Sequence, residues 1–315
     1  MSETRDFTAL DERMMRRAIQ LAYNGRMDVS PNPMVGCVIA VGDRIIGEGY
    51  HRRCGEGHAE VNAVASVTDA ALLREATAYV TLEPCSHYGK TPPCAQLLID
   101  RGLKRVVIGS GDPNVKVNGR GVAMLREAGI EVVTGVLEDD CRAINSHFMT
   151  AFSHNRPYVM LKWAQSTDGF MDVARTASDT PYLFSTPLNR AIVHRLRATH
   201  DGIMVGRRTA ELDRPALTVR YWAGRNPRKI IADGNESVPD LLAGLRSEGI
   251  TSLLVEGGAT LLSAFIGSGM WDEARVEVAP VILGDMGRAK APVMQVLPES
   301  YVTVDGNKVF IYRNI

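Results

Sequence analysis

Short β-rich segments alternate with helical stretches along this chain, and this alternation constrains the fold more than any other feature of the sequence. An amphipathic helix is predicted over residues 11–25, and the sequence Gly42-Asp43 predicts a hairpin. In the first half, strands are predicted at 36–41, 44–49, 78–82, 105–108 and 131–134, and further helices at 60–66, 93–101 and 122–128. Strands that alternate with helices favour an α/β fold in which helices cover both faces of a sheet.

The same alternation begins again after a polar segment, residues 153–157. The second half has predicted strands at 158–163, 202–205, 228–232, 252–255, 275–282 and 309–312, and predicted helices at 187–198, 239–248 and 260–267. A chain of 315 residues is long enough for two domains of ~100–200 residues, each with its own core. We therefore predict two α/β domains, residues 1–152 and 153–315.

Composition narrows the classes of partner. The chain has 36 basic and 36 acidic side chains, which disfavours nucleic acid as a partner. Its apolar runs are too short to span a bilayer, and its first twenty residues contain no apolar signal core. Five cysteines, an odd number with irregular spacing, are expected to be thiols or metal ligands in a reducing compartment. We therefore expect a cytoplasmic protein without a nucleic-acid or membrane partner.

His58, Cys85 and Cys94 have the residue types and the sequence context of a catalytic zinc site. One imidazole and two thiolates leave the fourth position of Zn²⁺ open for water, whose pKa the ion lowers toward neutrality. Glu60 is placed to carry a proton from this water to the ring nitrogen and the leaving amine. The order matches the known zinc-deaminase signature, His-x-Glu followed by Pro-Cys-x-x-Cys, although eight residues separate these two cysteines. The pattern predicts hydrolytic deamination of a pyrimidine-type amine.

Other interpretations of these residues remain open. The cluster would also suit a small structural zinc site or unmetallated core thiols, and Cys54 is close enough to His58 in sequence to be an outside candidate ligand. Cys37 lies in an apolar strand and is expected in the core. Rival functions are a nucleic-acid-editing deaminase with an RNA-binding tail and a non-enzymatic zinc-binding module. An aromatic content of 6% disfavours the RNA-binding tail.

Five short motifs lie in the first half of the chain. They are Ser30-Pro31-Asn32-Pro33-Met34-Val35-Gly36, Gly49-Tyr50-His51, His58-Ala59-Glu60, residues 83–94 and Asp112-Pro113-Asn114. Together they closely resemble the bifunctional deaminase-reductase family of riboflavin biosynthesis, with the eight-residue insert as the discriminating mark. The resemblance implies a cytidine-deaminase-like α/β/α domain that deaminates 2,5-diamino-6-(5-phosphoribosylamino)pyrimidin-4(3H)-one. It also implies substrate contacts from Asn32, His51, His87 and Lys90.

The second half contains residues 161–169, 194–198, 205–209, 215–220 and 255–258 in the order of the same family, which it resembles over most of its length. The resemblance implies a dihydrofolate-reductase-like domain that uses NADPH to reduce the ribosyl group to ribityl. The implied substrate-binding residues are Lys162, Arg197, Leu217, Arg220 and Glu256. The implied cofactor-binding residues are Ala164, Ser166, Asp168, Arg207, Thr209, Asp213, Gly257, Gly258, Ala259, Thr260, Leu261 and Leu262. A homo-oligomer, dimer or tetramer, is expected.

The residues themselves support this assignment in two places. Gly257-Gly258 follows a predicted strand and precedes a helix, so backbone N–H groups there could hold a pyrophosphate. An arginine after the strand at 202–205 could contact the 2′-phosphate of the cofactor. Taken alone, a Gly-Gly pair is commonly a turn, and an arginine is commonly a surface ion-pair partner.

Three features depart from the family pattern. Arg214 stands where an Asp is common, and residues 176–184 replace a Gly-x-Ser-x-Trp region that holds a substrate-binding Ser. Between residues 233 and 241 the chain lacks a strand and helix that relatives carry, either through a true deletion or through residues missing from this sequence. A true deletion would trim the sheet edge and part of the dinucleotide site. The alternative function is therefore a deaminase with a weak or inactive reductase-like domain that only binds or dimerises.

Overall fold

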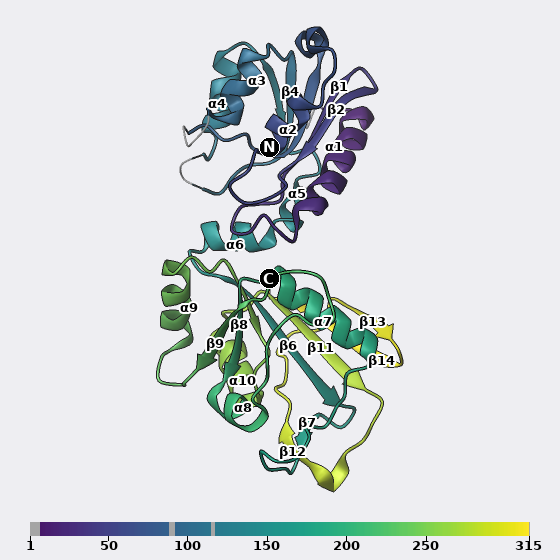
Figure 1. The fold of residues 1–315 in the computed structure, drawn as a ribbon, viewed down its shortest axis with the longest axis vertical. Helices are drawn as coiled ribbons and strands as arrows, with labels where there is room; N and C mark the ends of the chain where they lie inside the picture. The colour runs from purple at the N-terminus through teal and green to yellow at the C-terminus, as the bar shows by residue number, and fades with distance from the viewer. Residues whose placement is uncertain (1–6, 88–91, 115–116, 315) are drawn as a thin grey trace. The chain divides into compact units, whose positions relative to one another are not determined.

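The structure, a computed structural model, describes residues 7–87, 92–114 and 117–314. It divides into two compact units, Met1–His154 and Asn155–Ile315 (Figure 1). Each unit contains its own sheet and its own buried apolar clusters. No helix within the described residues is both long enough and apolar enough to cross a membrane.

The first unit is built on a five-stranded sheet of order β2-β1-β3-β4-β5. The strands are β1 (Gly36–Val41), β2 (Arg44–Tyr50), β3 (Thr77–Leu82), β4 (Arg105–Ser110) and β5 (Glu131–Thr134). Strand β1 is antiparallel to β2 and β3, whereas β3, β4 and β5 are parallel. Gly42, with a φ of +58°, makes the predicted hairpin turn between β1 and β2.

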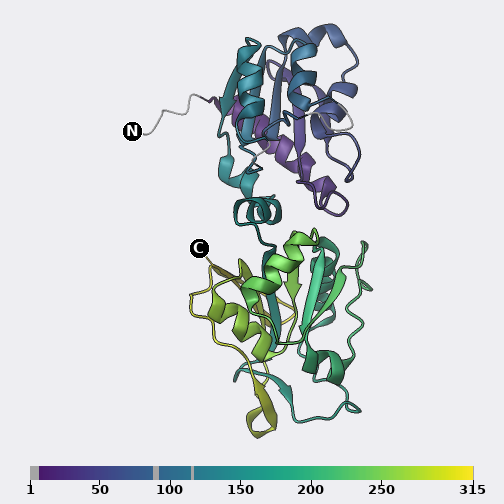
Figure 2. The same ribbon diagram turned by 90° about the vertical axis from the view of Figure 1, so that its left-hand side faces the viewer.

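Helices cover both faces of this sheet, as the alternation predicted (Figures 1 and 2). Side chains of β1 alternate between the faces, so Val38 packs with α1 (Ala9–Ala22) and α5 (Glu138–Ala143). Cys37 and Ile39 pack on the other face with α2 (Ala59–Ala65), α3 (Cys94–Asp100) and α4 (Arg120–Glu127). Cys37 is fully buried, which confirms its predicted place in the core. Helix α6 (Ser146–Ser153) ends the unit.

The second unit has a seven-stranded sheet of order β13-β14-β11-β6-β10-β8-β9. The strands are β6 (Tyr158–Ser166), β8 (Gly202–Gly206), β9 (Arg228–Ala232), β10 (Ser252–Val255), β11 (Glu273–Ala279), β13 (Ser300–Val304) and β14 (Asn307–Arg313). Helices α7 (Pro187–Thr199) and α8 (Arg207–Asp213) pack on the face of β6 that carries Tyr158 and Met160. Helices α9 (Val238–Ser247) and α10 (Ala259–Ser268) pack on the opposite face, which carries Leu161 and Trp163.

The structure differs from the sequence predictions mainly at short or exposed elements. The strand predicted at 275–282 ends at Ala279, because Pro280 has no N–H to donate to a neighbouring strand. Helices α5, α6 and α8, strand β13, and the two-stranded sheet of β7 (Phe170–Val173) and β12 (Gly287–Lys290) were not predicted. Residues 233–237 connect β9 directly to α9, so the shortened region leaves β9 as the sheet edge.

Candidate active sites

Three elements of the first unit bring the predicted zinc ligands together. His58 is the N-cap residue of α2, Cys85 follows β3, and Cys94 is the first residue of α3. His58 Nδ1 lies 3.6 Å from Cys85 Sγ and 3.3 Å from Cys94 Sγ, and the three ligand atoms all lie within 4.8 Å of one another. Zn–N and Zn–S bonds of about 2.0–2.3 Å require such spacing, so this donor set fits a zinc ion with an open position.

The surroundings of the two cysteines favour a thiolate. A hydrogen bond with Cys94 lowers the pKa of Cys85 to about 4, and the same bond raises the pKa of Cys94. The backbone N–H of Cys94 also donates to Cys85 Sγ, at 3.2 Å. The pair therefore keeps one negative sulfur readily and needs a cation before both sulfurs can lose their protons. Cys54 is exposed and does not belong to this cluster.

Glu60 lies in the first turn of α2 beside the ligand cluster and is only 3% exposed. Burial raises the pKa of its carboxyl group, and the negative charge of Cys85 adds to this shift. A carboxyl group with a raised pKa can both accept and return a proton near neutral pH. The position and the electrostatics of Glu60 are therefore those of a general acid and base.

Asn32 and His51 form a hydrogen-bonded pair next to the zinc ligands. The His51 ring lies edge-on to the ring of His58 with centroids 5.4 Å apart, and burial lowers its pKa. With Nδ1 donating to the Gly57 carbonyl (3.2 Å), Nε2 is left to accept from Asn32 Nδ2 (3.1 Å). This arrangement turns the Asn32 amide oxygen away from His51. His87 is exposed, and Lys90 lies outside the described residues.

Asp112 is a further polar residue at this site, to which sequence reasoning assigned no role. It follows β4 and is 9% exposed, and desolvation raises its pKa to about 6, with added effects from Glu83 and Cys85. The available signal was its position, since Asp112 and Cys85 follow adjacent parallel strands whose carboxyl ends share one edge of the sheet. Glu83 accepts hydrogen bonds from the N–H groups of Gly119 and Gly121 and so fixes the start of α4.

In the second unit, three predicted substrate residues gather on the face of the sheet covered by α7. Arg197 on α7 forms a two-pronged ion pair with Glu256, at 3.0 Å and 2.6 Å. Burial lowers the pKa of Lys162 on β6, while the charge of Glu256 opposes this shift. One charged group is therefore formed by Lys162, Arg197 and Glu256. Within it Arg197 belongs to an ion pair, which is the alternative role that the sequence left open for this arginine.

Residues 214–221 bring the other two predicted substrate residues to the same helix. Leu217 is buried with a φ of +52°, and Arg220 is exposed. The Nδ1 atom of His194 accepts hydrogen bonds from the N–H groups of Arg220 (2.7 Å) and Tyr221 (3.3 Å), and Arg197 Nη1 donates to the Thr218 carbonyl. The segment is thus held to α7 through its backbone.

The two motifs expected to hold NADPH lie together because β8 and β10 are parallel neighbours. A Cβ atom added to Gly258 would lie 3.2 Å from Thr209 Oγ1, so the two motifs approach closely. Gly258 is the N-cap of α10 and has no side chain to cap it, which leaves the first N–H groups of the helix for a ligand oxygen. This narrow, uncapped turn fits a pyrophosphate. Of the remaining segment, Leu262 is buried in the core, whereas Ala259, Thr260 and Leu261 are not.

The other predicted cofactor residues already have partners within the unit, except Ala164, which packs among apolar side chains. Arg207 donates to the Asp233 carbonyl, Asp213 pairs with Arg175, Asp168 accepts from the N–H groups of Leu283 and Gly284, and Ser166 Oγ accepts from the N–H of Phe170. In residues 176–184, which depart from the family pattern, Thr176 and Asp179 are hydrogen-bonded to each other. The geometry thus gives these positions structural roles, and their cofactor roles stay predictions.

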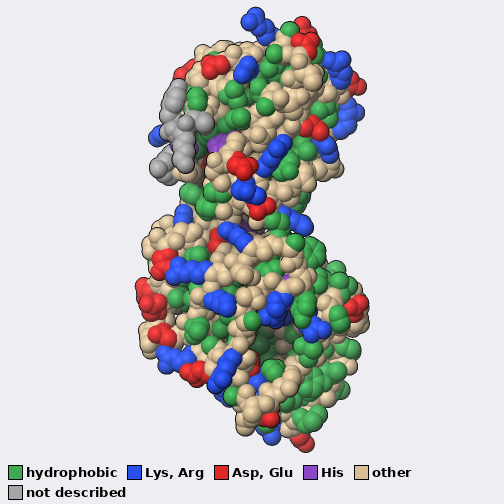
Figure 3. All heavy atoms as spheres, viewed as in Figure 1, with side chains coloured by type: hydrophobic (Ala, Val, Ile, Leu, Met, Phe, Trp, Pro, Cys, Tyr) green, Lys and Arg blue, Asp and Glu red, His purple; other side chains and the backbone are tan. Residues whose placement is uncertain are grey.

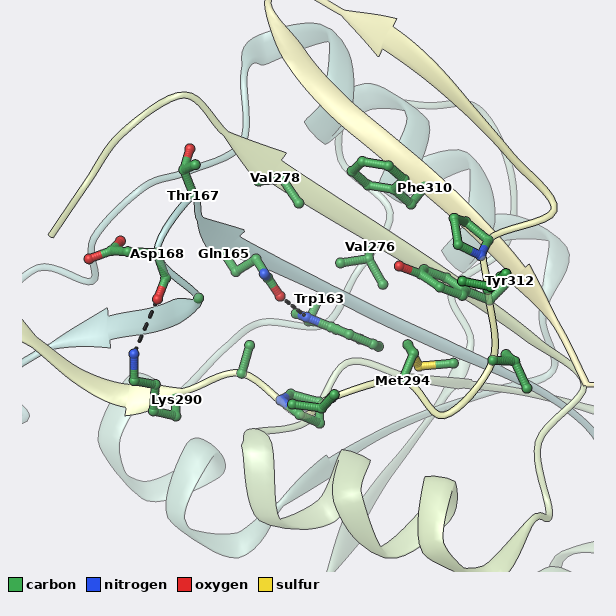
Figure 4. A pocket seen from close by; sticks show the side chains of 17 residues that line it. Trp163, Gln165, Thr167, Asp168, Val276, Val278, Lys290, Met294, Phe310 and Tyr312 are labelled. Carbon is green, nitrogen blue, oxygen red and sulfur yellow. Dashed lines mark hydrogen bonds between the residues drawn. The ribbon is translucent and has the colours of Figure 1, made fainter.

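A hollow of about 590 Å³ in the second unit is separate from the charged group of Lys162, Arg197 and Glu256 (Figure 4). Trp163 and Gln165 line it together with Phe310, Tyr312 and other largely apolar side chains. Side chains alternate along β6, so Trp163 and Gln165 point away from the face that carries Lys162. The hollow therefore lies on the opposite face of the sheet from Lys162, although Asp168, one of the predicted cofactor residues, also lines it.

Comparisons with known proteins agree with both halves of the chain. Residues 8–110 match the cytidine and deoxycytidylate deaminase zinc-binding region, and residues 157–242 and 237–305 match the RibD C-terminal domain. The riboflavin biosynthesis protein RibD of Actinobacillus pleuropneumoniae is 37% identical, over 91% of this chain and 88% of the relative. RibD of Escherichia coli (strain K12) is 36% identical, over 88% and 90%.

Solved structures give the same result. Acinetobacter baumannii RibD has a TM-score of 0.88 at 33% identity, over 96% of this chain and 98% of the other. A Thermotoga maritima protein described as a diaminohydroxyphosphoribosylaminopyrimidine deaminase/5-amino-6-(5-phosphoribosylamino)uracil reductase has a TM-score of 0.85 at 34% identity, with the same coverage. These matches confirm the predicted fold class and pair of activities, and they do not favour the rival functions. The chain belongs to the RibD family of riboflavin biosynthesis proteins, which join a zinc-dependent deaminase to an NADPH-dependent reductase.

Proposed function

We propose that the first unit deaminates 2,5-diamino-6-(5-phosphoribosylamino)pyrimidin-4(3H)-one and that the second unit then reduces its ribosyl group to ribityl. The description of the Thermotoga maritima relative, which names both activities and both substrates, supports this assignment. The observation that carries the proposal is the convergence of His58, Cys85 and Cys94 beside the buried carboxyl group of Glu60.

In the deaminase site, His58, Cys85 and Cys94 would hold the zinc ion, which when bound supplies Lewis acidity at its open position. Glu60 takes a proton from the attacking water and returns it to the pyrimidine ring nitrogen and the leaving amine. Its raised pKa supports both transfers. Asn32, oriented by His51, binds the pyrimidine edge, because an amide can donate and accept hydrogen bonds.

In the reductase site, NADPH when bound supplies the hydride. Thr209 and the turn at Gly257-Gly258 hold its pyrophosphate, and Lys162, Arg197 and Glu256 bind the hydroxyl and phosphate groups of the substrate. The ion pair between Arg197 and Glu256 keeps both side chains in fixed orientations. The remaining task of the protein is to bring the reacting carbon against the nicotinamide and to exclude water.

The proposal is tested by incubating the purified chain with the diaminopyrimidine substrate, with and without NADPH, and measuring product masses. Deaminated product without NADPH, and the doubly processed product with it, are the expected results. Reduction that fails while deamination continues would favour a reductase-like domain that only binds or dimerises.

Glu60→Gln sharpens this test because it removes the proton carrier but none of the metal ligands. We expect deamination to fall by about 10²–10⁴-fold while zinc content is unchanged. Glu56→Gln is the matched control, since Glu56 is exposed and lies four residues earlier. Loss of zinc together with activity in Glu60→Gln would contradict this division of roles.

The compartment and the oligomeric state are further parts of the proposal. None of the five cysteines forms a disulfide bond, and thiolate ligands persist best under reducing conditions, which supports the cytoplasm. A dimer or tetramer remains an expectation from the family resemblance, and sedimentation of the purified chain would measure it.

A further inference from the structure

The sheet face that carries Lys162 also carries two charged residues of β11, Arg275 and Glu277, to which no sequence motif assigns a role. Strands β6 and β11 are parallel, with Lys162 opposite Arg275 and Ala164 opposite Glu277. Opposite residues of paired strands point to the same face, so all four side chains lie on the face beneath α7. Diagonal neighbours such as Lys162 and Glu277 are about 7–8 Å apart, within reach of long side chains. Glu277 is therefore a second carboxylate on the same face as Lys162.

The carboxyl group of Glu277 is buried and held by two neutral donors. Its residue is 1% exposed, and it accepts hydrogen bonds from Ser185 Oγ and Asn307 Nδ2, both at 2.6 Å. No basic side chain of the described residues forms an ion pair with it. A carboxylate bonded only to a hydroxyl and an amide is costly to bury unless a nearby cation balances its charge.

Lys162 is the cation on this face that lacks a close partner. Burial lowers its pKa, and the charges of Glu256 and Glu277 oppose this shift, whereas those of Arg197 and Arg275 add to it. Glu256 is already engaged by the two hydrogen bonds from Arg197, so the effects of these two residues on Lys162 partly cancel. Glu277 is thus the carboxylate left to balance the charge of Lys162.

The surroundings of Lys162 are otherwise basic, since Lys and Arg side chains also gather on the surface over α7 (Figure 3). Like charges disfavour a protonated lysine, so a fixed carboxylate has a large part in keeping the ammonium group. We propose that Glu277 is a positioning residue of the reductase site, whose carboxylate keeps Lys162 charged and able to donate hydrogen bonds to the substrate. This inference rests on the proposed reductase function. In the competing view, Glu277 only anchors Ser185 and the chain that enters α7.

Two substitutions separate the charge of Glu277 from its anchoring role. Glu277→Gln removes the charge but can keep both hydrogen bonds, because the amide oxygen accepts from Asn307 and the amide N–H donates to Ser185 Oγ. Ser185→Ala removes the anchor but keeps the charge. The measurement is the pH dependence of kcat/KM for NADPH-dependent reduction by the full chain.

For Glu277→Gln we expect the alkaline limb of this profile to move to lower pH, because Lys162 loses its proton more easily without the carboxylate. The kcat/KM should fall about three- to tenfold at the alkaline pH where the wild type keeps half its activity, and little at neutral pH. Glu277→Asp keeps the charge and should restore most of the limb. Ser185→Ala should keep the wild-type limb, even if it unfolds more easily.

Glu273→Gln is the matched control on the same face of β11. Glu273 lies two residues before Arg275, as Glu277 lies two residues after it. Its carboxylate, however, accepts a hydrogen bond from the Tyr158 hydroxyl at 3.1 Å, so its charge is directed elsewhere. We expect an unmoved limb in Glu273→Gln and wild-type deaminase rates in every variant.

Several results would overturn the inference. An unmoved limb in Glu277→Gln, or an equal shift in Ser185→Ala or Glu273→Gln, would each do so. If the wild-type chain reduces nothing, the proposed function fails instead, and NMR titration of ¹³C-labelled lysine, assigned with Lys162→Arg, still decides this inference. A lower pKa of Lys162 in Glu277→Gln than in the wild type would support it, and equal values would refute it.

Discussion

The two active sites of this enzyme differ in how much of each is built before any ligand arrives. In the deaminase unit, three ligand atoms from three elements already lie within 4.8 Å of one another, with Glu60 buried beside them. In the reductase unit, the charges are paired internally or left open at the surface, and the cofactor site is a turn between a strand and a helix. The first site needs one ion, whereas the second needs two large ligands to complete it.

This difference has a physical reason. A zinc site demands particular ligand atoms at nearly fixed separations, so the polypeptide must hold those atoms close together in advance. A hydride-transfer site demands mainly that two bound molecules meet, and the cofactor supplies the chemistry. Single substitutions should therefore have large effects on function in the first unit and smaller, graded effects in the second.

The largest expected effect is that of Cys94→Ser, which removes a zinc ligand. We expect zinc content and deaminase activity to be lost together, because the ligand set no longer closes around the ion. NADPH-dependent reduction of the deaminated substrate should persist. Metal analysis and separate assays of the two reactions measure this, with exposed Cys54→Ser as the control that keeps both. Retention of zinc by Cys94→Ser would contradict the view that this site depends on every one of its ligand atoms.

Arg197→Gln should have the next largest effect, on stability as well as on substrate binding. It leaves the largely buried carboxylate of Glu256 without its counter-charge, which typically costs about 3–5 kcal/mol of unfolding free energy. Denaturant unfolding, followed in the second unit, measures the loss. Arg228→Gln, which breaks an exposed pair with Glu248, should cost less than about 1 kcal/mol. Similar losses in both variants would show that the Arg197 pair is no more than a surface contact.

The pH dependence of stability in the second unit should show the titration of His194. Desolvation and the nearby charges of Arg197 and Arg220 lower its pKa from 6.5 to about 4. Because the folded-state pKa lies below the unfolded value, neutral His194 contributes to the free energy of unfolding. This contribution is fully present above pH 6.5 and is lost as the pH falls through about 4. The loss should be at most about 3 kcal/mol, and His194→Gln should flatten it. Identical pH profiles of the two proteins would contradict this.

The smallest expected effect is that of Gly258→Ala at the cofactor turn. The new Cβ would lie 3.2 Å from Thr209 Oγ1, which can move aside at modest cost, so we expect a few-fold rise in the KM of NADPH. The deaminase should be unaffected. Gly267→Ala is the matched control on the same helix, because a Cβ there meets nothing within 4 Å. It should leave the KM unchanged and stabilise the helix by about 0.5–1 kcal/mol. A wild-type KM in Gly258→Ala would remove the steric argument for the turn.

Much of this fold was predictable because its main strands and helices follow regular patterns of apolar residues in the sequence. Buried strands such as β1, β4 and β10 appear as short apolar runs, and α1 appears as an amphipathic repeat. Two of the elements that escaped prediction, β13 and α8, have little burial, so their side chains follow no apolar period. Their formation depends on neighbouring strands and loops.

The two sites were not equally visible in the sequence. His58, Glu60, Cys85 and Cys94 form a rare combination of residue types, so these types and their order pointed to a shared metal ion. Arg197 and Glu256 are common residues separated by 59 positions, and only the family resemblance distinguished them from surface charges.

The sequence by itself determined the metal chemistry of this protein, because a zinc ion accepts few side chains and those side chains are scarce. Only the tertiary structure decided which charges are paired and which remain available. An arginine has the same letter in the sequence whether or not a carboxylate neutralises it. That difference depends on distances between elements far apart in the chain, and folding alone sets those distances.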